Sequence, residues 1–136
     1  MRAILFLANL QAMEIHPIHP PGHPALAPYS PAIVCGDFVF VSGQVPRDAA
    51  GAIVGDTIEN ATRQCLENVR EVLAAAGCSP SRVVKVTVFL QDMNDFERMN
   101  ATYAAFFGKH RPARTTVQVA KLPVNARIEI ECIAVK

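Results

Sequence analysis

The spacing of apolar residues changes repeatedly along this chain of 136 residues, and no other feature constrains its fold as strongly. Over 57–76, and again over 94–107, apolar residues recur every three or four positions, which predicts two helices. Asp56 and Glu59 are expected to form a capping box for the first helix, and Asn94 is expected to cap the second. Because neither helix is apolar all round, each is expected to pack one face against another layer.

The same kind of pattern predicts the strands. Apolar and polar residues alternate over 82–91 and 127–135, as in strands that are covered on one side. Shorter β-rich runs predict a hairpin of 37–41 with 52–54 and a further strand at 114–119. The resulting order, ββαβαββ, predicts an α+β domain in which one sheet carries both helices on one face.

The face of the sheet turned away from the helices is expected to be mixed. Alternation assigns the following residues to it: Lys85, Thr87, Arg114, Thr116, Gln118, Arg127, Glu129 and Glu131, with the apolar Val83, Phe89, Ile133 and Val135. Such a face is too polar for a core and too apolar for open solvent. We therefore expect it to be covered by copies of the same chain, with ligand sites in the clefts between them.

Composition excludes several classes of protein. The 13 lysines and arginines nearly balance the 12 acidic residues, and 51% of the residues are hydrophobic. This composition predicts one compact domain and does not suit a protein that neutralises nucleic-acid phosphates. No uncharged apolar run approaches the roughly 18 residues of a membrane span, so no membrane partner is expected. The four cysteines form no CxxC pair, which favours reduced thiols and a cytoplasmic protein.

Proline dominates the N-terminal part of the chain. Residues 14–31 hold six of the ten prolines and three of the four histidines, which predicts an extended segment without helix. We therefore divide the chain into an N-terminal arm, 1–27, and a domain, 28–136. The histidines of the arm have no rigid frame, so no metal site is expected. Met13 is an alternative start, and the short apolar run 4–7 lacks the cleavage pattern of a signal peptide.

Three polar residues have placements that suggest a site. Asn100 shares the apolar stripe of the second helix and needs a hydrogen-bond partner, either a ligand or a neighbouring loop. Arg114 follows Pro112 at the start of a strand, where a fixed guanidinium suits a small carboxylate or a surface ion pair. Glu129 lies in the middle of a strand, where it either activates a water or is solvated. His110, after the second helix, is expected at the surface.

Other reaction classes have no sequence support. The chain has no Ser-His-Asp order, no HExxH, no P-loop and no Cys/His set with metal-ligand spacing. Covalent, metal-dependent and nucleotide chemistry are therefore not expected.

Several segments carry a resemblance to a known family. They are Pro28-Tyr29, VFVSGQVP at 39–46, VTVFL at 86–90 with NDF at 94–96, NATY at 100–103, PARTTVQVAKLP at 112–123 and RIEIE at 127–131. Over about 28–136 the chain resembles the RidA/YjgF family of enamine and imine deaminases. The resemblance implies a chorismate-mutase-like fold, a homotrimer with sites between subunits, and hydrolysis of 2-aminoacrylate, through 2-iminopropanoate, to pyruvate and ammonia. That activity protects pyridoxal-phosphate enzymes and needs neither metal nor cofactor.

The resemblance also implies roles for individual residues. Arg114 would hold the substrate carboxylate and Glu129 the attacking water. The other substrate-binding positions that it implies are Tyr29, Ser42, Gly43, Asn100 and Thr116, the last of which replaces a cysteine of some relatives. The alternatives are a family member acting on another enamine such as an aminomuconate, a non-catalytic holdase or ligand-binding stress protein, and an RNA-cleaving protein, which the balanced charge disfavours.

Overall fold

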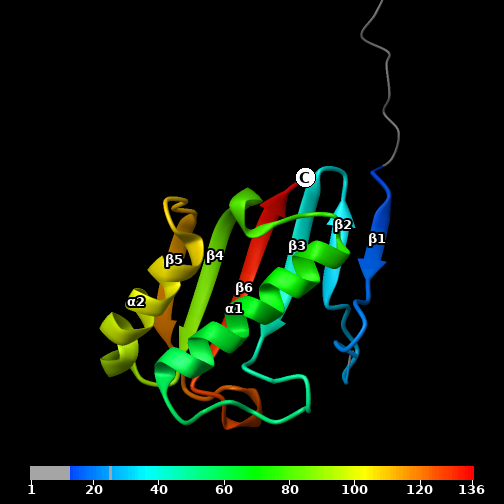
Figure 1. Cartoon of the computed structure of the whole chain (residues 1–136). Coiled ribbons are helices and arrows are strands. Elements are labelled where there is room, and N and C mark those ends of the chain that lie inside the picture. The colour runs from blue at the N-terminus through cyan, green and yellow to red at the C-terminus, as the bar shows by residue number, and fades with distance from the viewer. Residues whose placement is uncertain (1–12, 25) are drawn as a thin grey trace, which may run out of the picture.

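One six-stranded sheet carries two helices on the same face (Figure 1). The computed structural model describes residues 13–24 and 26–136. The strands are β1 (Ile15–Ile18), β2 (Ala32–Cys35), β3 (Phe38–Gln44), β4 (Val83–Leu90), β5 (Ala113–Gln118) and β6 (Ile128–Val135), and the helices are α1 (Ile58–Ala75) and α2 (Phe96–Phe107). The predicted α+β class, with one sheet and two helices on one side of it, is confirmed.

The strands lie in the order β1-β2-β3-β6-β4-β5. All neighbours are antiparallel except β4 and β5, which are parallel because α2 provides the crossover between them. In the register, Val88 of β4 lies opposite Ile130 of β6 and Thr116 of β5. Residues paired in this way point to the same side of the sheet, so the register decides which side chains face the helices.

The core lies between the sheet and the helices. The predicted apolar face of α1 is confirmed, since all of its members are buried: Ile58, Ala61, Cys65, Leu66, Val69, Val72, Leu73 and, just after the helix, Ala76. The stripe of α2 contributes Met99, Tyr103 and Phe107. On the sheet, Val86, Val88 and Leu90 of β4 are buried. The alternation in the sequence therefore predicted the covered side of this strand correctly from Val86 onward. Val84, which the same alternation assigns to that side, is 44% exposed, because the register shifts between Val83 and Lys85.

The predicted hairpin has a different partner. The strand at 37–41 exists as part of β3, but it pairs with β2, which precedes it, around a turn in which Gly36 has φ +57°. The predicted strand at 52–54 is wrong, because Ile53 forms only an isolated bridge to Arg47. The missed signal is the apolar run of β2 followed by glycine and aspartate, a combination that suits a tight turn.

Part of the predicted arm belongs to the sheet. Ile15–Ile18 is extended, and it pairs antiparallel with β2 as an edge strand. His23 then contacts α1, with Nε2 2.6 Å from Glu71 Oε2. The questions of an alternative start and of a signal peptide concern residues 1–12, which lie outside the described residues.

The caps of both helices differ from the predicted ones. Thr57 caps α1, and its Oγ1 accepts a hydrogen bond from the Asn60 backbone N–H at 3.1 Å. Asp56, the predicted cap, instead accepts from the Asn60 side chain. A short 3₁₀ turn, Met93–Asp95, comes before α2 and contains the predicted cap Asn94. Serine, threonine, aspartate and asparagine compete for the cap, so sequence alone locates it only to within a residue or two.

No helix among the described residues is long and apolar enough to cross a membrane.

We expect Asn68→Ala to destabilise the fold. The buried Asn68 side chain of α1 donates to the carbonyls of Val45 and Arg47, and so fixes the loop after β3. The alanine leaves these carbonyls without their donors, which should lower the free energy of unfolding by about 2 kcal/mol. Urea denaturation measures this. As a control, Asn60→Ala on the same helix removes only exposed side-chain bonds and should cost clearly less; equal losses would contradict the argument.

Candidate functional site

Arg114 lies on the helix side of the sheet, on the edge strand β5. It pairs with Val86, which is buried against the helices, so both side chains point toward that side. Its Cζ lies 4.6 Å from the centre of the Tyr103 ring and 5.7 Å from that of Phe96, both on α2. The prediction that Arg114 lies on the open face is therefore wrong. The sequence predicts correctly that side chains alternate along β5. It does not predict which of them share a face with Val86 of β4.

The Arg114 guanidinium has no charged partner. Within 13–24 and 26–136, no carboxylate lies close enough to pair with it and no hydrogen bond from it is formed. A planar guanidinium with free N–H groups in a half-buried position is suited to bidentate binding of a carboxylate. The alternative of a surface ion pair does not apply to the described residues.

Three polar groups around Arg114 lack partners. Asn100 Oδ1, Tyr103 Oη and Thr116 Oγ1 are buried and make no hydrogen bond, and the one other such atom among the described residues is Thr62 Oγ1. Thr116 follows Arg114 by two residues on the same side of β5, and Asn100 lies one turn before Tyr103 on α2. We call Asn100, Tyr103, Arg114 and Thr116 the arginine cluster. Unpartnered buried groups are costly, so their concentration here indicates a binding site.

A second group of predicted residues lies where β3 meets β6. Glu129 lies against Gly43, because a Cβ at position 43 would be 2.8 Å from Glu129 Cδ and closer still to Oε1. Ser42 Oγ donates to the Ser30 carbonyl at 2.6 Å, which ties the end of β3 to the segment that carries Tyr29. The Tyr29 side chain is 49% exposed. We call Tyr29, Ser42, Gly43 and Glu129 the glutamate cluster.

Glu129 is half-buried, and its electrostatic surroundings suit a base. Burial raises the pKa of its carboxyl above the usual value, and the nearby Glu131 carboxylate raises it further. A carboxylate with a raised pKa is a better proton acceptor at neutral pH than an ordinary glutamate. The prediction that Glu129 lies on the open face is confirmed by its pairing with Phe89, since the neighbouring Ile128 and Ile130 are buried in the core.

The two clusters lie on opposite faces of the sheet. Phe89 pairs with both Glu129 and Val117, so the row through Glu129 reaches β5 at Val117 on the open face. Arg114 and Thr116 point the other way. The described part of one chain therefore cannot bring both clusters to the same small molecule.

Of the other residues predicted on the open face, some lie there and some do not. Lys85, Thr87, Phe89, Glu131 and Ile133 lie there, as the register requires. Val83 is buried, and Gln118 pairs with Leu90 on the helix side. Arg127 lies before β6 and approaches Asp95 at 3.4 Å. His110, expected at the surface, is half-buried, and its Nε2 lies 2.7 Å from the Val83 carbonyl oxygen.

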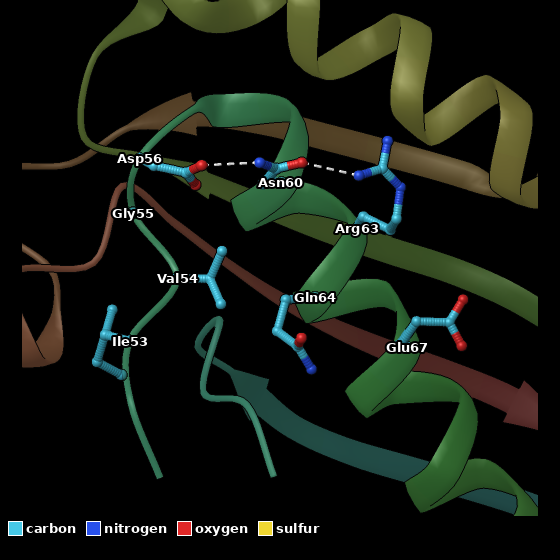
Figure 2. A pocket seen from close by; sticks show the side chains of 8 residues that line it. All are labelled: Ile53, Val54, Gly55, Asp56, Asn60, Arg63, Gln64 and Glu67. Carbon is cyan, nitrogen blue, oxygen red and sulfur yellow. Dashed lines mark hydrogen bonds between the residues drawn. The ribbon is translucent and has the colours of Figure 1, made fainter. Parts of the chain in front are cut away.

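Two hollows on the described part of the chain are lined by none of the residues of either cluster. One, of about 550 Å³, lies between the loop 53–56 and the first turns of α1 (Figure 2). There the Asn60 side chain donates to Asp56 Oδ2 and accepts from Arg63 Nη1, so both ends of its amide are already paired. Another, of about 470 Å³, lies between α1 and α2. A site completed by a second copy would not form a hollow in a single chain.

The chain belongs to the family described as endoribonuclease L-PSP, whose model matches residues 21–136. The recognition of the RidA/YjgF family from the sequence is thereby confirmed. A RutC family protein of Pyrococcus horikoshii is 52% identical over 112 residues, which cover 82% of this chain and 89% of the relative. The 2-iminobutanoate/2-iminopropanoate deaminase of Salmonella typhimurium is 45% identical over 115 residues, covering 82% and 90%. The crystal structure of Escherichia coli TdcF with bound serine is 40% identical, covers 89% of this chain and 98% of TdcF, and superposes with a TM-score of 0.84.

Sequence reasoning missed the two aromatic rings of the site. Tyr103 and Phe96 were assigned to the apolar stripe of α2, which they do share. The available signal was the polar Asn100 in that stripe, since a helix face that carries asparagine among aromatics is not a plain core face.

We expect Gly43→Ala to lower the pKa of Glu129. The new methyl group would occupy the space of the Glu129 carboxyl and push it toward water, where the charged form is better solvated. A carbon-13 NMR titration of the side-chain carboxyl measures the shift toward the ordinary glutamate value. Gly55→Ala is the matched control, because neither glycine has a positive φ and nothing lies within 4 Å of a Cβ at 55. An unchanged pKa in Gly43→Ala would contradict the contact.

Proposed function

We propose that this protein is a hydrolytic deaminase of short 2-imino and 2-enamino acids, which releases a 2-oxo acid and ammonia. The observation that carries the proposal is the unpaired guanidinium of Arg114, held by aromatic rings beside three buried polar atoms without partners. Such a cluster suits a small anion with hydrogen-bonding groups of its own, and 2-iminopropanoate has this character.

The relatives support this choice of substrate. The Salmonella protein bears the name of a 2-iminobutanoate/2-iminopropanoate deaminase. The TdcF structure contains serine, whose carboxylate and adjacent nitrogen are arranged as in a 2-imino acid. Both resemble this chain over more than four-fifths of its length.

Binding and orientation account for much of the proposed catalysis. Arg114 pairs with the carboxylate through two parallel N–H groups, and the polar atoms of Asn100 and Thr116 lie beside it. The carbon of a protonated imine is already electrophilic, so no protein nucleophile is required. Holding it beside a water in a near-attack geometry removes much of the entropic barrier.

Glu129 is the proposed base. It accepts a proton from the water as the oxygen adds to C2, and the C=N double bond becomes a C–N single bond in a tetrahedral carbinolamine. The carbinolamine then collapses: the C–N bond breaks, the hydroxyl gives up its proton to the departing nitrogen as the C=O bond forms, and the nitrogen leaves as ammonia in its protonated form. Glu129 returns its proton to the departing nitrogen. The sum is imine plus water giving 2-oxo acid plus ammonia, with no redox change, metal or cofactor.

The proposed enzyme is a homotrimer with its sites between copies. The arginine cluster of one copy meets the glutamate cluster of the next, since one sheet separates the two within a chain. The open face supports this assembly: Phe38 and Phe40 are 45% and 43% exposed there, side by side with ring centres 6.2 Å apart. Exposed aromatic pairs of this kind are typical of subunit interfaces.

A cytoplasmic location and a small-molecule partner complete the proposal. Cys35, Cys65, Cys78 and Cys132 are free thiols, as suits a reducing compartment. The near balance of charge, +1 overall, favours the imine reaction over RNA cleavage despite the family's description.

Arg114→Lys is expected to lower kcat/KM for 2-iminopropanoate by about a hundredfold, because lysine keeps the charge but loses the bidentate fork. Arg114→Ala should lose at least as much. The imine is generated by a serine dehydratase, and the rate of its disappearance is followed by trapping with semicarbazide. Arg70→Lys is the control, since Arg70 also lies over a ring, that of Phe106 at 4.7 Å, outside the site. Full activity of Arg114→Lys would overturn the role of Arg114, and an inactive wild type would overturn the function.

A further inference from the structure

The Arg114 side chain is oriented by the faces of two aromatic rings. Among the described residues no charged group takes part. β5 is the outermost strand, so no strand beyond it confines the guanidinium. An arginine side chain has many rotamers, and an unconfined one would lose this rotamer entropy on binding each substrate molecule. Some contact must therefore hold the guanidinium in place before the substrate arrives if binding is to be tight.

We propose that Tyr103 is a positioning residue, whose ring holds the Arg114 guanidinium in the orientation that binds the substrate carboxylate. The inference deepens the proposed function and rests on it. Of the two rings near Arg114, that of Tyr103 is closer, at 4.6 Å against 5.7 Å for Phe96. Both fall within the roughly 6 Å over which a cation is attracted to a ring face, but the attraction weakens with distance.

The Tyr103 ring is itself fixed. It is buried on the sheet-facing side of α2, and it packs against Phe107 with ring centres 4.7 Å apart. Phe107 in turn contacts Phe106 edge to face at 5.0 Å. An aromatic side chain has only two rotatable bonds, so this packing defines the plane on which Arg114 lies. The position of α2 therefore determines the orientation of the Tyr103 ring, and with it that of the guanidinium.

Tyr103 acts here as a neutral ring. Burial raises the pKa of its phenol to about 12, although the Arg114 charge opposes the rise. The contact with Arg114 is therefore that of a cation on a neutral ring face, and it does not change over the pH range in which the enzyme is assayed. Positioning thus depends on the ring and not on the hydroxyl, which predicts that phenylalanine at 103 keeps the preference for a charged ligand over an uncharged one.

The test compares the affinity for an acid with that for its uncharged amide. Dissociation constants of 2-oxobutanoate and 2-oxobutanamide are measured by NMR titration for the wild type, Tyr103→Leu and Tyr103→Phe. Tyr103→Leu should weaken binding of the acid about tenfold and leave that of the amide within about twofold. Tyr103→Phe keeps the ring and should therefore keep the ratio of the two constants within about twofold of wild type, whatever the hydroxyl contributes to both ligands. Arg70→Leu is the control, since it removes a similar ring–arginine contact, to Phe106 at 4.7 Å, and leaves the rings of α2 in place; it should leave both constants within about twofold.

Two results would overturn the inference. Equal weakening for acid and amide in Tyr103→Leu would show a merely structural role. A Tyr103→Phe variant that loses the preference for the acid as Tyr103→Leu does would assign the effect to the hydroxyl. The ratio of the two constants does not depend on the fraction of folded protein, so partial unfolding of a variant cannot mimic the result. Hydrolysis of 2-iminopropanoate by the wild type is measured separately, and its absence would reject the proposed function whatever the binding ratio.

Discussion

The pairing register of the last three strands is the constraint on which the site depends. It places Val86 and Arg114 on the helix side, and Phe89 and Glu129 on the open side. Side chains alternate strictly along a strand, so a slip of one residue in β5 would move Arg114 to the other face and away from the rings of α2. Parallel pairing with β4 and the crossover through α2 fix this register.

The open face of the sheet follows from the same constraint. Among the described residues both helices, α1 and α2, cover the same side of the sheet (Figure 1), and the aromatic residues of β3 on the other side are exposed. In the proposed trimer, the same contact between neighbouring copies covers this apolar surface and completes the site. The interface would then be held by hydrophobic burial, while the unpaired Arg114 and the partly desolvated Glu129 supply the chemistry.

Sequence patterns predicted most of the fold and half of the geometry of the site. Periodicity found both helices and the strands from β3 onward, because burial on one face enforces it. It missed β1, whose Ile15–Ile18 contains a proline and is exposed at the edge, and it chose the wrong partner for β3. The sequence singled out Arg114 and Glu129 as candidates, but it could not say which face Arg114 occupies, because the relative phase of two strands is a tertiary property. For the same reason it predicted Tyr103 as a core residue, which it is, but not its contact with Arg114.

The central claim is that one catalytic site takes Arg114 from one copy and Glu129 from another. It is tested most directly by mixing Arg114→Ala with Glu129→Gln in equal amounts, unfolding and refolding them together, and measuring hydrolysis of 2-iminopropanoate. Each variant alone should be inactive. In random mixed trimers about a quarter of the sites would receive both intact residues, so the mixture should recover roughly a quarter of the wild-type rate. A mixture that forms mixed trimers and stays as inactive as its components would contradict the account.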